Sequence, residues 1–365
     1  MEDFFRTLIR EEARDLPVYV PGKPIEEVKR EFGLREVIKL ASNENPWGPS
    51  PRAQEAMCQA VATIERYPDG SAFVLRAALA ASLGLKPQNF LFGNGSEEIV
   101  SMVAKVFFRP GDEVLMGRPT FPLYATFARL MGAVPVELDL TPEGYYPLAA
   151  MLEHLSDKTR AVFICNPNNP SGTGLSGLEI RTFVQQVPRE VILVFDEAYY
   201  EFATDQFSGL EFLAQDRPVI VLRTFSKAYG LAGIRIGFAV AHPTLVDGLN
   251  RVRTAFNVDA VAQAGALAAW QDRSYLAEIV EKNRTEREFL TAKLAALGVR
   301  MFASQTNFIM AFFGAKGAGL ADALLRRGII VRPGQAFGYP DGLRISIGTH
   351  AENEKLVAAL TELLQ

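Results

Sequence analysis

The chain has 365 residues and a formal net charge of -4, with 48% hydrophobic and 22% charged residues, as in an ordinary soluble globular protein. This balance gives no electrostatic attraction toward nucleic acid or acidic lipid. No apolar run approaches the roughly 20 residues that span a bilayer, and residues 1–15 lack the apolar core of a signal peptide. We therefore expect a cytoplasmic protein whose partners include neither nucleic acid nor a membrane.

The chain from residue 90 to about 241 alternates short apolar runs with helical stretches, which predicts a mostly parallel sheet covered by helices. We expect strands at 113–116, 134–138, 161–164, 191–195, 219–222 and 238–241. Helices are expected at 96–107, 124–131 and 176–185.

The pattern changes after residue 255 to that of a smaller α+β unit. Helices are expected at 261–271, 275–297, 318–327 and 352–364, with strands at 299–302, 307–313, 329–331 and 343–347. Because the chain is long for a single core, we expect more than one domain. We predict an amino-terminal arm (1–40) that packs with the small domain, a large domain (41–255) and a small carboxyl-terminal domain (256–365).

Few residues suit a disulfide framework or a metal site. The two cysteines are Cys58 and Cys165, and the three histidines (His154, His242 and His350) show no ligand spacing. We expect no bound metal.

The segment 224–238, Thr-Phe-Ser-Lys-Ala-Tyr-Gly-Leu-Ala-Gly-Ile-Arg-Ile-Gly-Phe, carries the strongest chemical signal. An apolar run leads into Ser226 and Lys227, and a glycine-punctuated stretch then carries Arg235. Burial and a neighbouring cation would lower the pKa of the Lys227 amine and prepare it to form a Schiff base with an aldehyde. Ser226 and Arg235 could hold the anionic group of a cofactor that carries this aldehyde, and pyridoxal 5′-phosphate (PLP) meets both demands.

Asp196 closes the apolar run 191–195, which is typical of a strand buried on both faces. Ligands of open α/β sheets lie at the carboxyl ends of such strands. A carboxylate there suits the ring nitrogen of PLP. Two turns follow other apolar runs, one around Asn169 and one at Gly95-Ser96-Glu97, where a helix start suits a phosphate.

In this order the motifs resemble the fold-type I PLP enzymes of the aspartate aminotransferase superfamily. That resemblance implies an α/β fold in which helices sandwich a mostly parallel seven-stranded sheet, beside a smaller α+β domain. It implies that Lys227 forms the Schiff base and that Asp196 pairs with the ring nitrogen, while Tyr199 and Asn169 bond the phenolic oxygen. It also implies a ring stacked on Phe121 and a phosphate site built by Gly95, Ser96, Glu97, Ser226 and Arg235.

Finer motifs at 19–24, 42–46, 67–70, 332–334 and 343–349 resemble the histidinol-phosphate aminotransferase family. The resemblance implies a homodimer in which Tyr67 reaches the PLP phosphate of the neighbouring subunit. It implies that Tyr19, Asn43, Arg332 and Arg344 bind substrate. The implied reaction, in histidine biosynthesis, is transamination between L-histidinol phosphate and 2-oxoglutarate, which gives imidazole acetol phosphate and glutamate.

Three alternatives share much of this pattern. One is an aminotransferase for phenylalanine or tyrosine, and another is a PLP decarboxylase that acts on threonine phosphate. The third is the PLP-binding effector domain of a transcription regulator. The short stretch before Asn43 leaves little room for the DNA-binding module of such a regulator, and the net charge of -4 also disfavours it.

Overall fold

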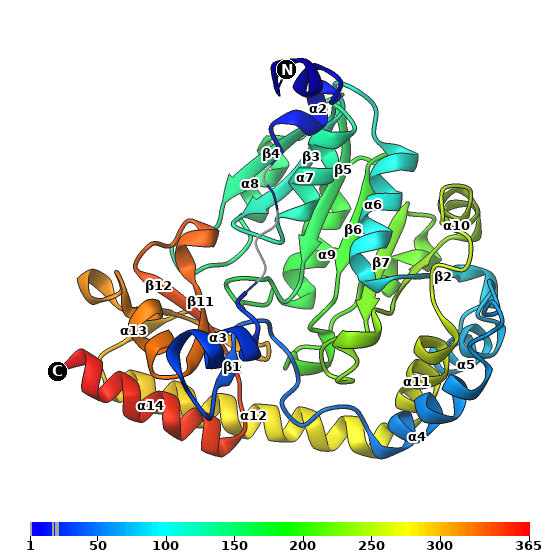
Figure 1. Ribbon diagram of the computed structural model, residues 1–365. Coiled ribbons are helices and arrows are strands. Elements are labelled where there is room, and N and C mark those ends of the chain that lie inside the picture. The colour runs from blue at the N-terminus through cyan, green and yellow to red at the C-terminus, as the bar shows by residue number, and fades with distance from the viewer. Residues whose placement is uncertain (1, 17, 19–21) are drawn as a thin grey trace.

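The computed structural model describes residues 2–16, 18 and 22–365, which form a seven-stranded and a five-stranded β-sheet with helices packed against them (Figure 1). Helix α12 (Arg273–Ala296) runs along one edge of the molecule, from the larger part toward the smaller (Figure 1). The predicted α/β class with a large sheet and a smaller one is confirmed.

Six of the seven strands in the large sheet point the same way. The sheet order is β2-β8-β7-β6-β5-β3-β4, and β8 is antiparallel to both of its neighbours. The strands are β2 (Phe90–Gly93), β3 (Glu113–Arg118), β4 (Val134–Asp139), β5 (Thr159–Cys165), β6 (Ile192–Asp196), β7 (Val219–Thr224) and β8 (Gly237–Ala241). The six strands predicted from 113 to 241 all form, with ends that differ by one or two residues.

The central strands are hydrophobic along their whole length because both faces of the sheet are covered. Every residue of β6 and β7 is buried, so neither strand has the alternating polar positions of a sheet with one wet face. The helices around this sheet include α6 (Gly95–Phe107), α7 (Leu123–Leu130), α8 (Leu148–Glu153), α9 (Gly177–Gln186) and α10 (Pro243–Asn250).

The small sheet has the order β1-β11-β12-β10-β9. Its strands are β1 (Ile38–Leu40), β9 (Arg300–Met301), β10 (Phe308–Phe312), β11 (Ile329–Pro333) and β12 (Gly342–Ser346). Strand β1 comes from the amino-terminal segment and pairs in parallel with β11, with Ile38 opposite Ile329. The sequence did not predict β1, because three residues are too few to show a periodic pattern.

The remaining helices join and cover the two sheets. They are α1 (Glu2–Thr7), α2 (Glu11–Arg14), α3 (Ile25–Phe32), α4 (Pro51–Ala60), α5 (Phe73–Leu83), α11 (Ala260–Gln271), α13 (Leu320–Arg326) and α14 (His350–Leu364). Helix α11 packs against α4 and α5 and contributes Trp270 to the apolar cluster that also holds Phe225 and Phe238. The division of the chain near residue 256 stays a prediction. In the described part of the chain, no helix has both the length and the apolarity needed to cross a membrane.

Candidate active site

Two neighbouring parallel strands bring Asp196 and Lys227 to the same edge of the large sheet. Asp196 is the last residue of β6 and is paired with Leu222 of β7. Lys227 follows three residues after the end of β7. Both side chains therefore lie at the carboxyl ends of the strands, where open α/β sheets bind their ligands.

The carboxylate of Asp196 is buried, with 5% of the residue exposed, and is held by two hydrogen bonds. Its Oδ2 accepts from the Tyr124 hydroxyl at 2.6 Å, and its Oδ1 accepts from the backbone N–H of Ala198 at 3.1 Å. Burial raises the pKa of Asp196, and the hydrogen bond from Tyr124 opposes that effect. A buried carboxylate in this state gains strongly from a cationic partner.

The amine of Lys227 is buried and is more easily deprotonated than that of an ordinary lysine. Its Nζ donates to the backbone oxygen of Ser42 at 3.3 Å and lies 5.9 Å from the centre of the Tyr199 ring. Burial, together with the positive charge of Arg344, lowers the pKa of Lys227 to about 8. A substantial fraction of this amine is therefore neutral at physiological pH, as covalent chemistry on an aldehyde requires.

The Tyr199 hydroxyl contacts the segment that follows β1. Asn43 Nδ2 donates to the Tyr199 oxygen at 2.9 Å. Burial raises the pKa of Tyr199 far above its usual range, so the hydroxyl stays protonated. Asn43 has a φ of 54°, a left-handed conformation that asparagine tolerates better than most residues.

Arg344 links the small sheet to the Asn169 turn. Its Nη1 donates to Asn169 Oδ1 at 2.6 Å, and its Nη2 donates to the backbone oxygen of Ala41 at 2.8 Å. Arg332 is the direct cross-strand partner of Arg344 in the antiparallel pair of β11 and β12. Directly opposite residues project from the same face of a sheet, so two guanidinium groups share one neighbourhood.

Three groups converge where helix α6 begins. The backbone N–H of Gly95 donates to the Arg235 oxygen at 3.1 Å, and Arg235 Nη1 donates to the Ser226 hydroxyl at 3.3 Å. Gly95 has a φ of +75°, and a Cβ added there would lie 2.5 Å from Arg235 Nη2. The glycine thus lets a guanidinium lie against the start of the helix, beside Ser96 and Glu97. A hydroxyl, a guanidinium and a helix amino terminus form a donor set that fits a phosphate.

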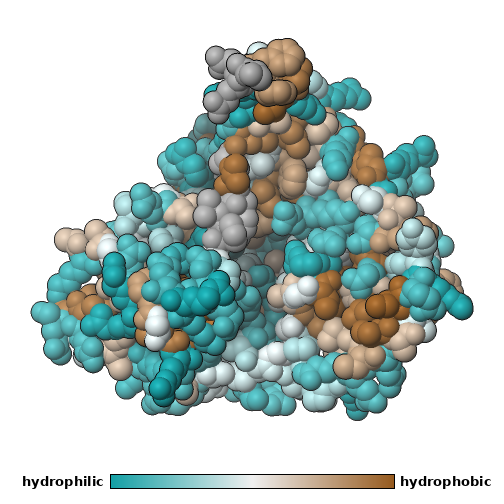
Figure 2. Space-filling model, in the orientation of Figure 1, coloured by the Kyte–Doolittle hydropathy of each residue, from teal (hydrophilic) through white to brown (hydrophobic). Residues whose placement is uncertain are grey.

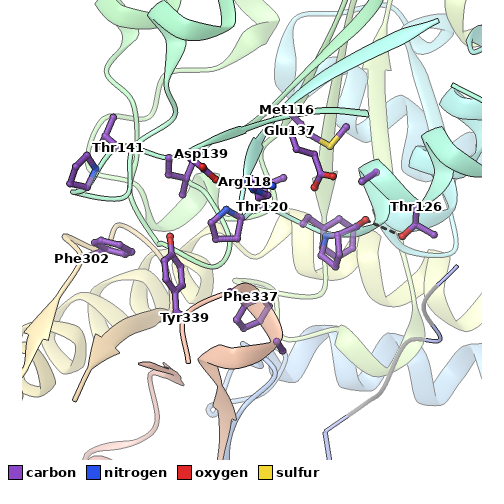
Figure 3. A pocket seen from close by; sticks show the side chains of 18 of the residues that line it. Met116, Arg118, Thr120, Thr126, Glu137, Asp139, Thr141, Phe302, Phe337 and Tyr339 are labelled. Atoms are coloured by element: carbon purple, nitrogen blue, oxygen red, sulfur yellow. Dashed lines mark hydrogen bonds and ion pairs between the residues drawn. The ribbon is translucent and has the colours of Figure 1, made fainter. Parts of the chain in front are cut away.

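Phe121 lines a cavity of about 630 Å³ between the large sheet and the small one. Its ring packs edge-on against Tyr124 at 5.5 Å. Figure 3 shows Phe302, Phe337 and Tyr339 on one side of this cavity and Arg118, Thr120 and Asp139 on the other.

One predicted residue, Tyr67, lies on the surface and outside the contacts described above. Tyr67 is 82% exposed and stacks on Phe256, with 4.7 Å between the ring centres. Tyr19 lies outside the described residues.

The structure also shows supporting residues that the sequence did not reveal. Beside Asp196, the Glu197 carboxylate accepts from Arg223 at 2.8 and 3.0 Å and from the N–H of Gly209 at 2.7 Å. This ion pair is 2% and 6% exposed and joins the ends of β6 and β7. Tyr124 and the Glu197–Arg223 pair carried no local signal, because their roles depend on neighbours distant in the chain.

The sequence model of the family "Aminotransferase class I and II" matches residues 35–360. A histidinol-phosphate aminotransferase from Geobacillus sp. (strain WCH70) is 44% identical over 359 residues, which cover 98% of each chain. The chain therefore belongs to the class I and II aminotransferases and, within them, to the histidinol-phosphate aminotransferase family.

Solved structures agree with this assignment. The crystal structure of histidinol-phosphate aminotransferase from Sinorhizobium meliloti, in complex with pyridoxal-5′-phosphate, is 29% identical and has a TM-score of 0.90. The match covers 98% of this chain and 97% of that one. Thermus thermophilus aspartate aminotransferase, at 21% identity and a TM-score of 0.83 over 97% and 99% of the two chains, shows the same fold. The predicted fold and family are confirmed.

The lowered pKa of Lys227 leads to a prediction for the cofactor-free protein. Labelling of this amine by trace acetic anhydride should rise with pH and level off just above the pKa of about 8, since only the neutral amine reacts. An exposed lysine should keep rising toward pH 10.5, the ordinary value. Peptide mass spectrometry measures both in one sample, with Lys23, whose pKa is raised above 10.5 by its hydrogen bond to Glu31, as the internal control. A Lys227 inflection near that of Lys23 would show that burial does not lower the pKa of Lys227.

Proposed function

We propose that the chain transfers an amino group between L-histidinol phosphate and 2-oxoglutarate, with PLP as cofactor, and so forms imidazole acetol phosphate and glutamate for histidine biosynthesis. The observation that carries this proposal is the position of Lys227 and Asp196 at one sheet edge, close enough to Arg344 for its charge to lower the pKa of Lys227. Arg332 lies opposite Arg344 on the neighbouring strand. The amine and carboxylate suit the cofactor, and the arginines suit an anionic substrate.

The cofactor fits the residues at the strand ends. Its phosphate would be held by Gly95, Ser96, Glu97, Ser226 and Arg235, where the donors converge on the start of α6. Asp196 would pair with the ring nitrogen, and Phe121 would lie against the ring. Asn169 and Tyr199 would hydrogen-bond the phenolic oxygen.

When bound, the cofactor supplies an aldehyde that links to amines and a pyridinium ring that withdraws electrons from the substrate Cα. Lys227 Nζ would first hold the aldehyde. As a free amine, this Nζ would take the substrate Cα proton as a general base, because a pKa of about 8 leaves about half of it neutral at pH 8. The same atom would then return the proton.

Asp196 would keep the ring cationic. Its carboxylate is buried, and an ion pair in such a place is strong because water screens it little. The Tyr124 hydroxyl and the Ala198 N–H fix both carboxylate oxygens, so that the negative charge is oriented before the cofactor arrives.

Substrate recognition would rest on anion binding. Arg344 would take the carboxylate of glutamate, and Arg344 and Arg332 together would face the phosphate of histidinol phosphate, with Asn43 and Tyr19 beside them. Two like charges directly across a strand pair repel each other. A phosphate dianion can accept hydrogen bonds from both guanidinium groups at once, which favours a substrate that carries one.

We also propose a homodimer in which Tyr67 reaches the phosphate site of the partner. Tyr67 stacks on Phe256, and the stretches on either side of it in sequence expose further apolar side chains: Val61, Ile64, Phe73 and Val74. Figure 2 shows hydrophobic surface gathered over α5 and α11 in the same region. An exposed apolar area of this kind is typical of a protein interface.

Two further predictions remain as proposals. The division into an arm (1–40), a large domain (41–255) and a small domain (256–365) is supported by the two separate sheets and by the pairing of β1 with β11. Helix α2 of the arm, however, packs against α7, and α11 packs against α4. Localisation in the cytoplasm continues to rest on composition.

The function is tested by adding histidinol phosphate and 2-oxoglutarate to the purified protein and assaying glutamate. Lys227→Ala should lower turnover by roughly 10³-fold or more, because it removes both the amine nucleophile and the general base. It should also abolish the visible absorption band of the covalently held cofactor. Retained turnover in Lys227→Ala would remove this residue from the mechanism, and a native protein without glutamate production would refute the reaction.

The substrate class is tested by Arg332→Ala. Loss of a charge-assisted contact should lower kcat/KM for histidinol phosphate by about 10- to 100-fold, since such a contact contributes roughly 1.5–3 kcal/mol. With phenylalanine as donor, which needs a single carboxylate contact, the loss should stay below about threefold. Equal losses with the two donors would overturn the assignment of the phosphate to this pair of arginines.

The dimer is tested by mixing two weakly active variants, Tyr67→Ala and Lys227→Ala, under conditions that exchange subunits. If Tyr67 acts across the interface, each hybrid dimer regains one native site, and activity should rise to as much as about one quarter of the native value. Native protein carried through the same exchange is the control. No gain over the unmixed variants would place Tyr67 outside the partner's site.

A further inference from the structure

Asn43 lies where the small sheet meets the catalytic edge of the large one. Its backbone N–H donates to the Ser346 hydroxyl of β12 at 2.8 Å, and its side-chain oxygen accepts from that hydroxyl at 3.3 Å. Its backbone oxygen accepts from Asn307 Nδ2 at 2.9 Å. The residue is almost fully buried, so these bonds hold both its backbone and its amide in one orientation.

The orientation of this amide determines what the Tyr199 hydroxyl can do. Because Oδ1 faces Ser346, the NH₂ group faces Tyr199 and donates to its oxygen at 2.9 Å. A phenol has one proton to donate. With its oxygen occupied by the Asn43 donor, Tyr199 cannot turn its proton toward that neighbour and must donate it elsewhere.

We propose that Asn43 is a positioning residue that aims the Tyr199 hydroxyl proton at the phenolic oxygen of the bound cofactor. The inference rests on the proposed function, because the contact between Tyr199 and the phenolic oxygen is part of that proposal. Asn43 itself needs no contact with the cofactor to act in this way. Ser346 and Arg344 lie two residues apart on β12 and so share a face of the strand, which connects the positioning of Tyr199 to the strand proposed to bind substrate.

The Tyr199 hydroxyl is suited to this role because it does not ionise. Burial keeps its pKa far above the usual range, although the charge of Arg344 and the hydrogen bond from Asn43 oppose the effect. The charged and titratable groups that act on Tyr199 or on the Lys227 amine are Arg344, Arg235, Glu44, Asp196 and Cys165. Each of them is unchanged in the variants used below.

The experiment follows the visible absorption band of the bound cofactor as a function of pH. A donor to the phenolic oxygen stabilises its negative charge and lowers the midpoint of this titration. Asn43→Gly removes the amide and keeps a residue suited to the φ of 54°. We expect the midpoint to rise by roughly 0.5–1 pH unit, the equivalent of one hydrogen bond.

The controls distinguish a loss of Tyr199 positioning from a general loosening of the segment that carries Asn43. Asn45→Gly removes a side chain of the same segment whose amide donates to the backbone oxygens of Ala228 and Gly48, and it should leave the midpoint unchanged. Tyr199→Phe should raise the midpoint at least as much as Asn43→Gly does. In the double variant, Asn43→Gly should add nothing to Tyr199→Phe, because its effect passes through that hydroxyl.

Each outcome either supports or overturns the positioning role of Asn43. A midpoint that moves in Tyr199→Phe and stays in Asn43→Gly overturns the positioning role and leaves the proposed function intact. A shift from Asn43→Gly that persists without the Tyr199 hydroxyl, or that Asn45→Gly reproduces, also overturns it. No shift in Tyr199→Phe removes the contact between Tyr199 and the cofactor, and the inference fails with it. Circular dichroism of each variant confirms that the fold compared is the native one.

Discussion

A carboxylate and an amine can share one ligand only while the ends of β6 and β7 stay in register. That register is maintained by the sheet ladder and by the buried pair of Glu197 and Arg223, one residue from Asp196 and four from Lys227. Loss of one partner of a buried ion pair strongly destabilises the protein, because the remaining charge is buried without compensation. When both partners are present, the pair is favourable only in a well-defined geometry. The electrostatic character of the site follows from this arrangement: Asp196 is buried because β6 is central, and the Lys227 amine loses its proton easily because it lies in the same poorly hydrated edge.

The site also depends on the segment that connects the two sheets. The short segment after β1 touches Lys227 through Ser42, Tyr199 through Asn43 and Arg344 through Ala41. Its residues are few, yet they bond to both sheets at once. The groups proposed to bind substrate therefore cannot move freely relative to the groups proposed to hold the cofactor.

Much of this architecture could be predicted from the sequence. Buried parallel strands are continuous apolar runs, and an acid or a lysine that follows such a run stands out; Asp196 and Lys227 were found in this way. The turn that holds Asn169 was also found in this way, but the choice of Asn169 within it came from resemblance. Phe121 and Tyr67 came from resemblance alone, because single aromatic residues carry no periodic signal. Tyr124 and Glu197 were missed, since a tyrosine at the start of a helix or a second acid after a strand acquires its role only when distant segments pack together. Strand β1 was missed for a related reason, because its partner lies almost 300 residues away.

The antiparallel course of β8 has a consequence for how such a protein can change. Because the chain leaves the sheet at Thr224 and returns at Gly237, the amine, hydroxyl and guanidinium proposed to hold the cofactor all come from one short loop. Arg332 and Arg344 belong to another sheet and another stretch of the chain. Mutations in β11 and β12 can change the preference for one amine donor over another without changing the loop between β7 and β8. New substrate specificities can therefore evolve while the residues proposed to hold the cofactor stay the same.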